Sequence, residues 1–403
     1  MSTETLFQRI ADYANRADPY PLYAELREHG VARQQDGSYL VGTYDEVVQL
    51  LHDPRISSDT RNRTEPDPEI YDLVPTFIRV DDPEHERLRG IAMRPFGPPH
   101  TPGRIDALRG DIARITRELI DGFDGRERID LVDDFAYPLP VTVIGKLLGI
   151  PAGDMGQLRQ WTDIMIESLD FGRDEDAVTK RQRGTDARRA MAGYLGDLAE
   201  SRRDHPSDDM LSAFVADAGP EGAFTPAELM STAALLLIAG HETTVNLITN
   251  GALTLLRQPE MLARLRDDPA LMPSAVEELL RYEPPVQFLP QRTPLADVEV
   301  AGVTVPKGAP LVLVLASANR DPLRFDEPDR FDPARRDNQH LGFGSGVHSC
   351  FGAPLARLEA QIALTALLDR LGEGTRLVED PPPYRTSPLL RGPRHLWIEA
   401  TAP

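Results

Sequence analysis

The spacing of apolar residues predicts a mainly helical chain. One run, residues 225–258, is apolar on almost every side and has no proline after its first turn, so it predicts a long buried helix. Thr225-Pro226-Ala227-Glu228 opens this run with a capping box and with proline at the first helical position. Shorter amphipathic helices are predicted at residues 19–30, 44–52, 104–123, 140–148, 154–169, 273–282 and 353–371.

The pattern leaves only a minor part for β-structure. Residues 31–41 alternate around a central Asp-Gly pair, which favours a hairpin, and residues 298–305 predict a second pair of short strands. We interpret residues 54–75 as a long loop and residues 171–186, which are highly charged, as a mobile connection between helices. Neither a repeat nor a clean linker interrupts the sequence, so we predict a single domain over residues 1–403.

Composition excludes several classes of protein. The chain has 44 Lys and Arg against 64 Asp and Glu, a formal net charge of -20, which argues against binding to the phosphates of nucleic acid. Residues 1–18 lack the basic segment and apolar core of a secretory signal, and no apolar run reaches the roughly twenty residues of a membrane span. We therefore expect a monomeric cytoplasmic protein without membrane or nucleic-acid partners.

The candidate chemistry centres on Cys350, the only cysteine, which excludes internal disulfides and metal cages built from several cysteines. It follows a glycine-rich run that begins at residue 340 and stands just before the helix predicted at 353–371. Unpaired N–H groups and the dipole at a helix start favour the thiolate, which is the form that binds metal. Phe343 could shield the sulfur from water. The alternative is a small buried apolar cysteine, the commoner role of a lone cysteine.

The full run Phe343-Gly-x-Gly-x-His348-x-Cys350-x-Gly352 resembles the haem-binding loop of cytochrome P450, the family of haem-thiolate monooxygenases. The resemblance implies a haem b cofactor with Cys350 as the proximal iron ligand and His348 on a haem propionate. Phe343 and Gly352 would also lie at the cofactor. A thiolate ligand would push electron density onto the iron and favour O–O cleavage.

A second signal lies inside the long predicted helix, at Ala239-Gly240-His241-Glu242-Thr243. A carboxylate and a hydroxyl are costly to bury in an apolar helix unless they are used, although a polar strip facing solvent is the alternative. Gly240 would open space beside the backbone, and Thr243 could loosen one turn by bonding back to the helix. The run resembles the family's oxygen-binding signature. That implies that Thr243 hydrogen-bonds dioxygen, that Glu242 relays protons, and that Ala239 and Gly240 adjoin the haem.

Further residues are assigned by position within the resemblance. His85 and Arg89, four apart on a helix, could clamp a dianion, although a solvated charged face is the commoner case. They resemble the family's propionate-binding His and Arg, and Arg292 is expected as a further propionate partner.

Glu278 and Arg281 are three apart and can form an ion pair, which would be worth little if it were exposed. They resemble the family's structural Glu-x-x-Arg pair, which supports the cysteine loop. Arg330 is the expected third member of this group.

The resemblance covers essentially the whole chain and implies a mainly helical triangular prism with a minor β-rich part. It implies hydroxylation or epoxidation that consumes O2 and two electrons, supplied by a ferredoxin and a ferredoxin reductase. These would dock on a basic patch, for which Arg87, Arg94 and Arg357 are candidates.

The substrate is predicted only by class. Phe288, Leu289 and Leu389 would line its site, which favours a bulky, mainly apolar small molecule such as a polyketide, macrolide or terpenoid intermediate. A fatty-acid or xenobiotic hydroxylase is the alternative within the family. A non-catalytic haem sensor and a haem-free cysteine hydrolase are alternatives of other classes, and the sequence has no nucleophile elbow for the last.

Overall fold

The structure is a computed structural model that describes residues 5–64, 76–97, 100–168, 175–216, 219, 222–372 and 374–401. The chain forms two compact units. Unit 1 comprises Met1–Pro66, Ile115–Ala136 and Thr243–Pro403, and unit 2 comprises Asp67–Arg114 and Tyr137–Glu242. Two of the four unit boundaries fall within helices, one in α6 (Arg109–Asp121) and one in α11 (Pro226–Leu256). That residues 1–403 form a single domain stays a prediction.

Unit 1 contains the strands of the described chain. Its five-stranded sheet has the order β1-β2-β8-β5-β3, in which β2 and β8 are parallel and the other neighbours are antiparallel. The predicted hairpin and the strand pair at 298–305 are both present. The strands are β1 (Val31–Arg33), β2 (Tyr39–Val41), β3 (Ile56–Ser57), β4 (Arg128–Asp130), β5 (Leu289–Pro294), β6 (Val298–Val300), β7 (Val303–Val305), β8 (Leu311–Leu313), β9 (Arg376–Leu377) and β10 (Trp397–Glu399).

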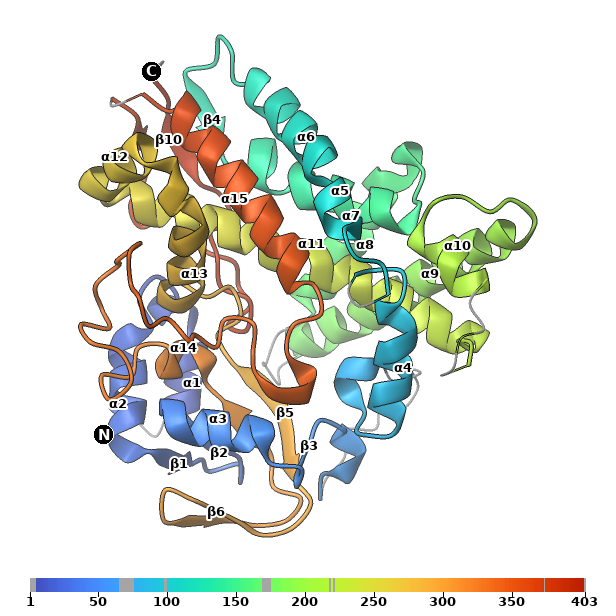
Figure 1. Cartoon of the computed structure of the whole chain (residues 1–403). Helices are drawn as coiled ribbons and strands as arrows, with labels where there is room; N and C mark the ends of the chain where they lie inside the picture. The colour runs from blue at the N-terminus through green and yellow to red at the C-terminus, as the bar shows by residue number, and fades with distance from the viewer. Residues whose placement is uncertain are drawn as a thin grey trace. The chain divides into compact units, whose positions relative to one another are not determined.

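The helices of unit 1 pack on this sheet and on one another. Helix α14 contacts α2 and α3, and α15 contacts α12 and α13, beside which it runs in Figure 1. One apolar cluster lies between α3 and strands β1, β2 and β8, and a second joins α2 to β2 and β8. The helices are α1 (Leu6–Ala11), α2 (Tyr20–His29), α3 (Tyr44–His52), α12 (Pro259–Asp267), α13 (Met272–Tyr282), α14 (Leu315–Ala318) and α15 (Ala353–Arg370).

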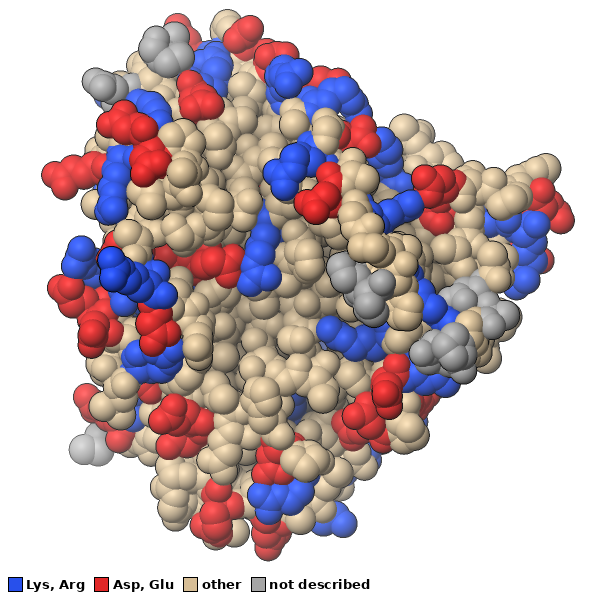
Figure 2. All heavy atoms as spheres, in the orientation of Figure 1, with Lys and Arg blue, Asp and Glu red and all other residues tan. Residues whose placement is uncertain are grey.

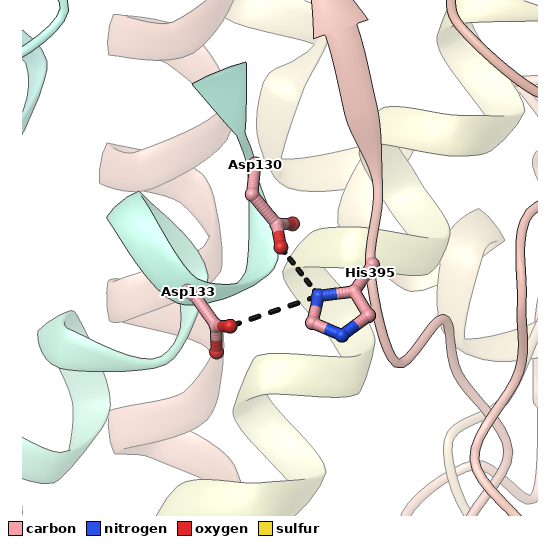
Figure 3. Close-up of side chains that lie close together, drawn as sticks. All are labelled: Asp130, Asp133 and His395. Atoms are coloured by element: carbon pink, nitrogen blue, oxygen red, sulfur yellow. Dashed lines mark hydrogen bonds and ion pairs between the residues drawn. The ribbon is translucent and has the colours of Figure 1, made fainter. Parts of the chain in front are cut away.

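A histidine and two aspartates join strands β4 and β10 in unit 1. His395 Nδ1 lies 2.6 Å from an oxygen of Asp130 and 3.6 Å from one of Asp133, as Figure 3 shows. The other oxygen of Asp130 accepts hydrogen bonds from the backbone N–H groups of Val132 and Leu396, each at 3.0 Å. These are donor types that bind metals, but both oxygens of Asp130 are already used within the cluster. We therefore interpret the cluster as a structural link.

In the residues that the structure describes, the helices of unit 2 are accompanied by no named strand, only by an isolated antiparallel bridge between Gly219 and Gly222. Helix α9 contacts α8 and α10, and α7 contacts the same two helices. Its helices are α4 (Glu84–Met93), α5 (Arg104–Ala107), α7 (Pro138–Leu148), α8 (Met155–Glu167), α9 (Glu175–Asp204) and α10 (Met210–Ala216).

The interpretation of residues 171–186 as a mobile connection was wrong from residue 175 onward, where α9 begins. Its charges sit at helical spacing, as in the i,i+4 ion pair of Lys180 with Asp176. Buried Ala187, Met191, Leu195 and Ala199, spaced four apart, then anchor the helix. Residues 171–174, and residues 65–75 of the predicted long loop, lie outside the described residues.

Helix α11 is α-helical from Pro226 to Leu256, without the loosened turn predicted at Thr243. Its capping box is present, since Glu228 N–H donates to the Thr225 hydroxyl and Thr225 N–H donates to the Glu228 carboxylate. Among the described residues, no helix combines the length and the apolar character that a membrane span requires.

Candidate functional site

Cys350 lies in unit 1, in the loop that leads into α15, and its side chain is exposed. Its backbone N–H donates to the carbonyl oxygen of Phe343 at 2.8 Å, and Gly344 N–H donates to Leu341 at 2.8 Å. Gly344 adopts a φ of 67°, in the left-handed region that favours glycine. The loop therefore folds back on itself around the cysteine.

Other glycines allow the loop to approach its neighbours closely. A Cβ on Gly346 would lie 2.4 Å from the carbonyl oxygen of Leu51, and one on Gly342 would lie 2.6 Å from that of Leu280. A Cβ on Gly352 would meet no described atom within 4 Å. A lone exposed thiol with open space beside Gly352 fits a flat cofactor that brings its own remaining iron ligands.

Other predicted site residues of unit 1, in the cofactor and catalytic groups, have the following positions. His348 is half-buried at the end of a 3-10 turn, and Arg292 is buried on β5, opposite Leu311 of β8. Thr243 is half-buried on α11.

The predicted substrate residues do not share one environment. Leu289 and Leu389 are half-buried, and Leu389 accepts a backbone hydrogen bond from Gln287 at 2.9 Å. Phe288 is 0% exposed, because it belongs to the apolar cluster that joins α2 to β8, and its ring lies edge-on to Phe7. That Phe288 lines the substrate site stays a prediction.

The predicted structural pair is formed, and both of its members are 0% exposed. Arg281 donates two hydrogen bonds to Glu278, at 2.8 Å each. The third cation is Arg335, whose Nε lies 3.2 Å from both oxygens of Glu278, and not Arg330. The Arg330 side chain is mostly exposed and pairs with Glu327, so only its backbone carbonyl joins the group by accepting from Arg281. Arg335 was missed because it lies outside the short phrase that carried the prediction.

His85 and Arg89 lie on α4 in unit 2. His85 is 4% exposed and donates from Nδ1 to Asp82 at 3.0 Å. The Arg89 guanidinium lies 6.0 Å from the centre of the Phe77 ring. The four-residue spacing keeps both side chains on one side of the helix.

The middle of α11 alternates between buried and more exposed positions. Glu242 is 0% exposed, whereas Ala239 is exposed and Gly240 and Thr243 are half-buried. Positions 239 and 243 are four apart, so they share one face of the helix. Gly240 makes room for a neighbour, because a Cβ there would lie 3.2 Å from the side chain of Ile144.

Comparison with known proteins assigns the family. The family model described as cytochrome P450 matches residues 177–396. The chain is 42% identical over 397 residues to cytochrome P450 monooxygenase PikC of Streptomyces venezuelae, covering 95% of this chain and 91% of that protein. It is 38% identical over 386 residues to mycinamicin IV hydroxylase/epoxidase of Micromonospora griseorubida, covering 93% and 94%.

A solved structure gives the same result for the fold. Myxobacterial cytochrome P450 CYP267B1, solved in complex with myristic acid, is 38% identical and superposes with a TM-score of 0.88. The match covers 98% of this chain and 100% of that one, which confirms the predicted fold. The chain therefore belongs to the cytochrome P450 family, and it is a monooxygenase that binds haem b through a cysteine thiolate.

Proposed function

We propose that this P450 hydroxylates or epoxidises a bulky, mainly apolar small molecule of the polyketide, macrolide or terpenoid kind, as a tailoring step in natural-product synthesis. The observation that carries the proposal is the similarity, across 93% of the chain, to an enzyme named for both hydroxylation and epoxidation. Leu289 and Leu389, which the resemblance assigns to the substrate site, are half-buried and apolar, which suits a substrate of this kind. The alternative, a fatty-acid hydroxylase, is favoured by the myristic acid in the CYP267B1 complex.

The experiment that separates these substrates is a binding titration of the purified holoenzyme. Displacement of water from the haem iron changes the Soret spectrum, so macrolides, terpenoids and fatty acids can be compared directly. We expect saturable shifts with macrolide or terpenoid ligands and at least about tenfold weaker binding of myristate, a difference of about 1.4 kcal/mol. Tighter binding of myristate would replace the proposal with its alternative.

By the family resemblance, Cys350 would ligate the iron, and His348, Arg292, His85 and Arg89 would hold the propionates. The bound haem supplies the means to activate O2. The Thr243 hydroxyl would donate a hydrogen bond to dioxygen, and the buried Glu242 carboxyl would hold the proton to be delivered. Burial of Glu242 supports this role, because a carboxyl shielded from water exchanges its proton through defined neighbours.

We expect Thr243→Ala to consume NADPH while forming roughly tenfold less product per NADPH, since proton delivery would lose its aligned hydroxyl. Product and peroxide are quantified together, in the presence of a ferredoxin, its reductase and a substrate. Thr249→Ala is the matched control, because that hydroxyl, on the same helix, donates to the carbonyl of Val245 at 2.9 Å. An unchanged amount of product per NADPH in Thr243→Ala would contradict the role given to Thr243. If the parent enzyme consumed no NADPH in response to substrate, the alternative of a haem sensor would be favoured.

Ferredoxin docking remains part of the proposal. Acidic and basic side chains intermingle on the face shown in Figure 2. The three candidate arginines are all engaged: Arg87 pairs with Glu228, Arg94 donates to the carbonyl of Gly222, and Arg357 pairs with Glu277. An acidic ferredoxin would therefore meet partly compensated charge at these residues, so we expect docking to weaken with salt.

A further inference from the structure

A chain of three contacts leads from Glu277, on α13, to the backbone of Cys350. The Glu277 carboxylate accepts two hydrogen bonds from Arg357, from Nε at 2.7 Å and from Nη2 at 2.8 Å. The guanidinium of Arg357, on α15, lies 4.6 Å from the centre of the Phe343 ring. The carbonyl of Phe343 in turn accepts the Cys350 N–H. A two-pronged carboxylate bond fixes the plane of a guanidinium, so Glu277 orients Arg357 against the ring.

His340 gives Glu277 a second hold on the same loop. The Gly342 N–H donates to His340 Nδ1 at 3.0 Å, so Nδ1 is an acceptor and the ring proton resides on Nε2. His340 Nε2 then donates to Glu277 at 3.1 Å. His340 thus ties Glu277 to the backbone of the cysteine loop at Gly342.

The charges of the pair are fixed over any working pH. Burial opposes ionisation of Glu277, but hydrogen bonds from Arg357 and His340 outweigh it and lower the pKa of Glu277 to about 2. The hydrogen bond to Glu277 raises the pKa of Arg357, and the nearby Cys350 contributes in the same direction. A positive charge thus acts on the cysteine, and one negative charge compensates it.

We propose that Glu277 is a positioning residue that, through Arg357, sets the reduction potential of the haem iron held by Cys350. The proposal rests on ligation by Cys350 and goes beyond it. An uncompensated cation beside a thiolate stabilises the extra electron of the ferrous state, and an uncompensated anion has the opposite effect. Because Glu277 neutralises Arg357, the iron feels little net charge from this direction.

The experiment is a potentiometric titration of the substrate-free holoenzyme and of three variants. Glu277→Gln should raise the ferrous-to-ferric ratio at a fixed applied potential about three- to tenfold, where tenfold corresponds to 59 mV for one electron. Arg357→Gln should lower the ratio by a similar factor. The double variant, which again has no net charge here, should return close to the parent value. A merely structural pair is not expected to shift the reduction potential in opposite directions in the two single variants and to restore it in the double variant.

The matched control is the pair of Arg9 and Glu25, which is also two-pronged, through Nη1 and Nη2. Its side-chain exposure is similar, 38% and 36% against 38% and 29% for Arg357 and Glu277. Arg9→Gln and Glu25→Gln should leave the potential unchanged. Shifts of the same sign in both site variants, or shifts no larger than in the control pair, would overturn the proposal.

Thiolate ligation is monitored in every sample by the red-shifted Soret band of the reduced carbon monoxide complex. If Glu277→Gln loses haem, Glu277→Asp and Arg357→Gln test the proposal instead. Glu277→Asp keeps the charge, so its reduction potential should stay near that of the parent. The reduction potential of Arg357→Gln should fall. If Cys350→Ala retained the red-shifted band, the ligation assignment would fail, an outcome distinct from an unchanged potential in a protein that keeps this band.

Discussion

Glu359, on α15, is a carboxylic acid that is 0% exposed, and neither of its oxygens hydrogen-bonds to any described residue. Burial raises its pKa well above the ordinary value. The folded protein therefore keeps the proton to a higher pH than the unfolded chain does. The contribution of this group to stability is fully present below the unfolded pKa of about 4.3, and it is lost as pH rises toward the folded pKa.

We expect Glu359→Gln to remove this pH dependence. Relative to the variant, the parent should lose about 1.4 kcal/mol of unfolding free energy for each pH unit above about 4.5, because only its unfolded state can ionise at residue 359. Urea unfolding at pH 5 and pH 7.5 measures the difference in unfolding free energy between the parent and the variant. The contributions of all other carboxylates cancel in this difference. Parallel stability curves would show that Glu359 is ionised in the folded protein.

At the residue scale, the candidate site was predicted from sequence where its residues are contiguous. The glycines, Phe343, His348 and Cys350 fall within one run, and the close approach of Gly346 to Leu51 explains why no larger residue fits there. Glu277 and Glu359 were missed, because their local sequence resembles that of a glutamate on a solvated helix face. Neither the distant arginine that binds Glu277 nor the lack of a partner for Glu359 can be recognised from neighbouring residues.

At the scale of elements, Asp130 links β4 to β10 by accepting hydrogen bonds from Val132, Leu396 and His395. Asp130→Ala should lower the unfolding free energy by about 1–3 kcal/mol, since two buried N–H groups lose their acceptor. Asp133→Ala is the control, because that carboxylate is a third exposed, at 34%, and lies farther from His395. Thermal unfolding of the two variants measures their losses of stability. Equal losses would show that the link does not depend on Asp130.

The elements were predictable to the extent that their signals are local. Helices α3 and α15 begin where they were expected, because apolar periodicity and the residues before them mark their starts. Helix α9 was misjudged because charge was taken to mean irregular structure, although ion pairs such as that of Lys180 with Asp176 sit well on a helix. The pairing of β4 with β10 and of β2 with β8 joins distant segments, and no short window of sequence encodes such a register.

At the largest scale, unit 1 is assembled from segments far apart in the chain. Arg391 is 2% exposed and donates to the backbone carbonyls of Arg16 and Ala17, at 2.8 Å each, and to the carboxylate of Glu283. Glu283 also pairs with Arg320, whose guanidinium lies between the rings of Tyr20 and Tyr282. The two ends of unit 1 are thus joined through buried charges. Truncation of either end would leave a buried charged or polar group without its partner.

The parallel pairing of β2 with β8 has a consequence for how the protein is made. Tyr39, Leu40 and Val41 are buried, and their partners Leu311–Leu313 come 272 residues later in the chain. At about 5–20 residues per second, β8 leaves the ribosome tens of seconds after β2. During that interval the apolar edge of β2 lacks its partner strand and can pair with strands of other nascent chains. Chaperones that bind exposed strands during synthesis should therefore raise the yield of folded protein.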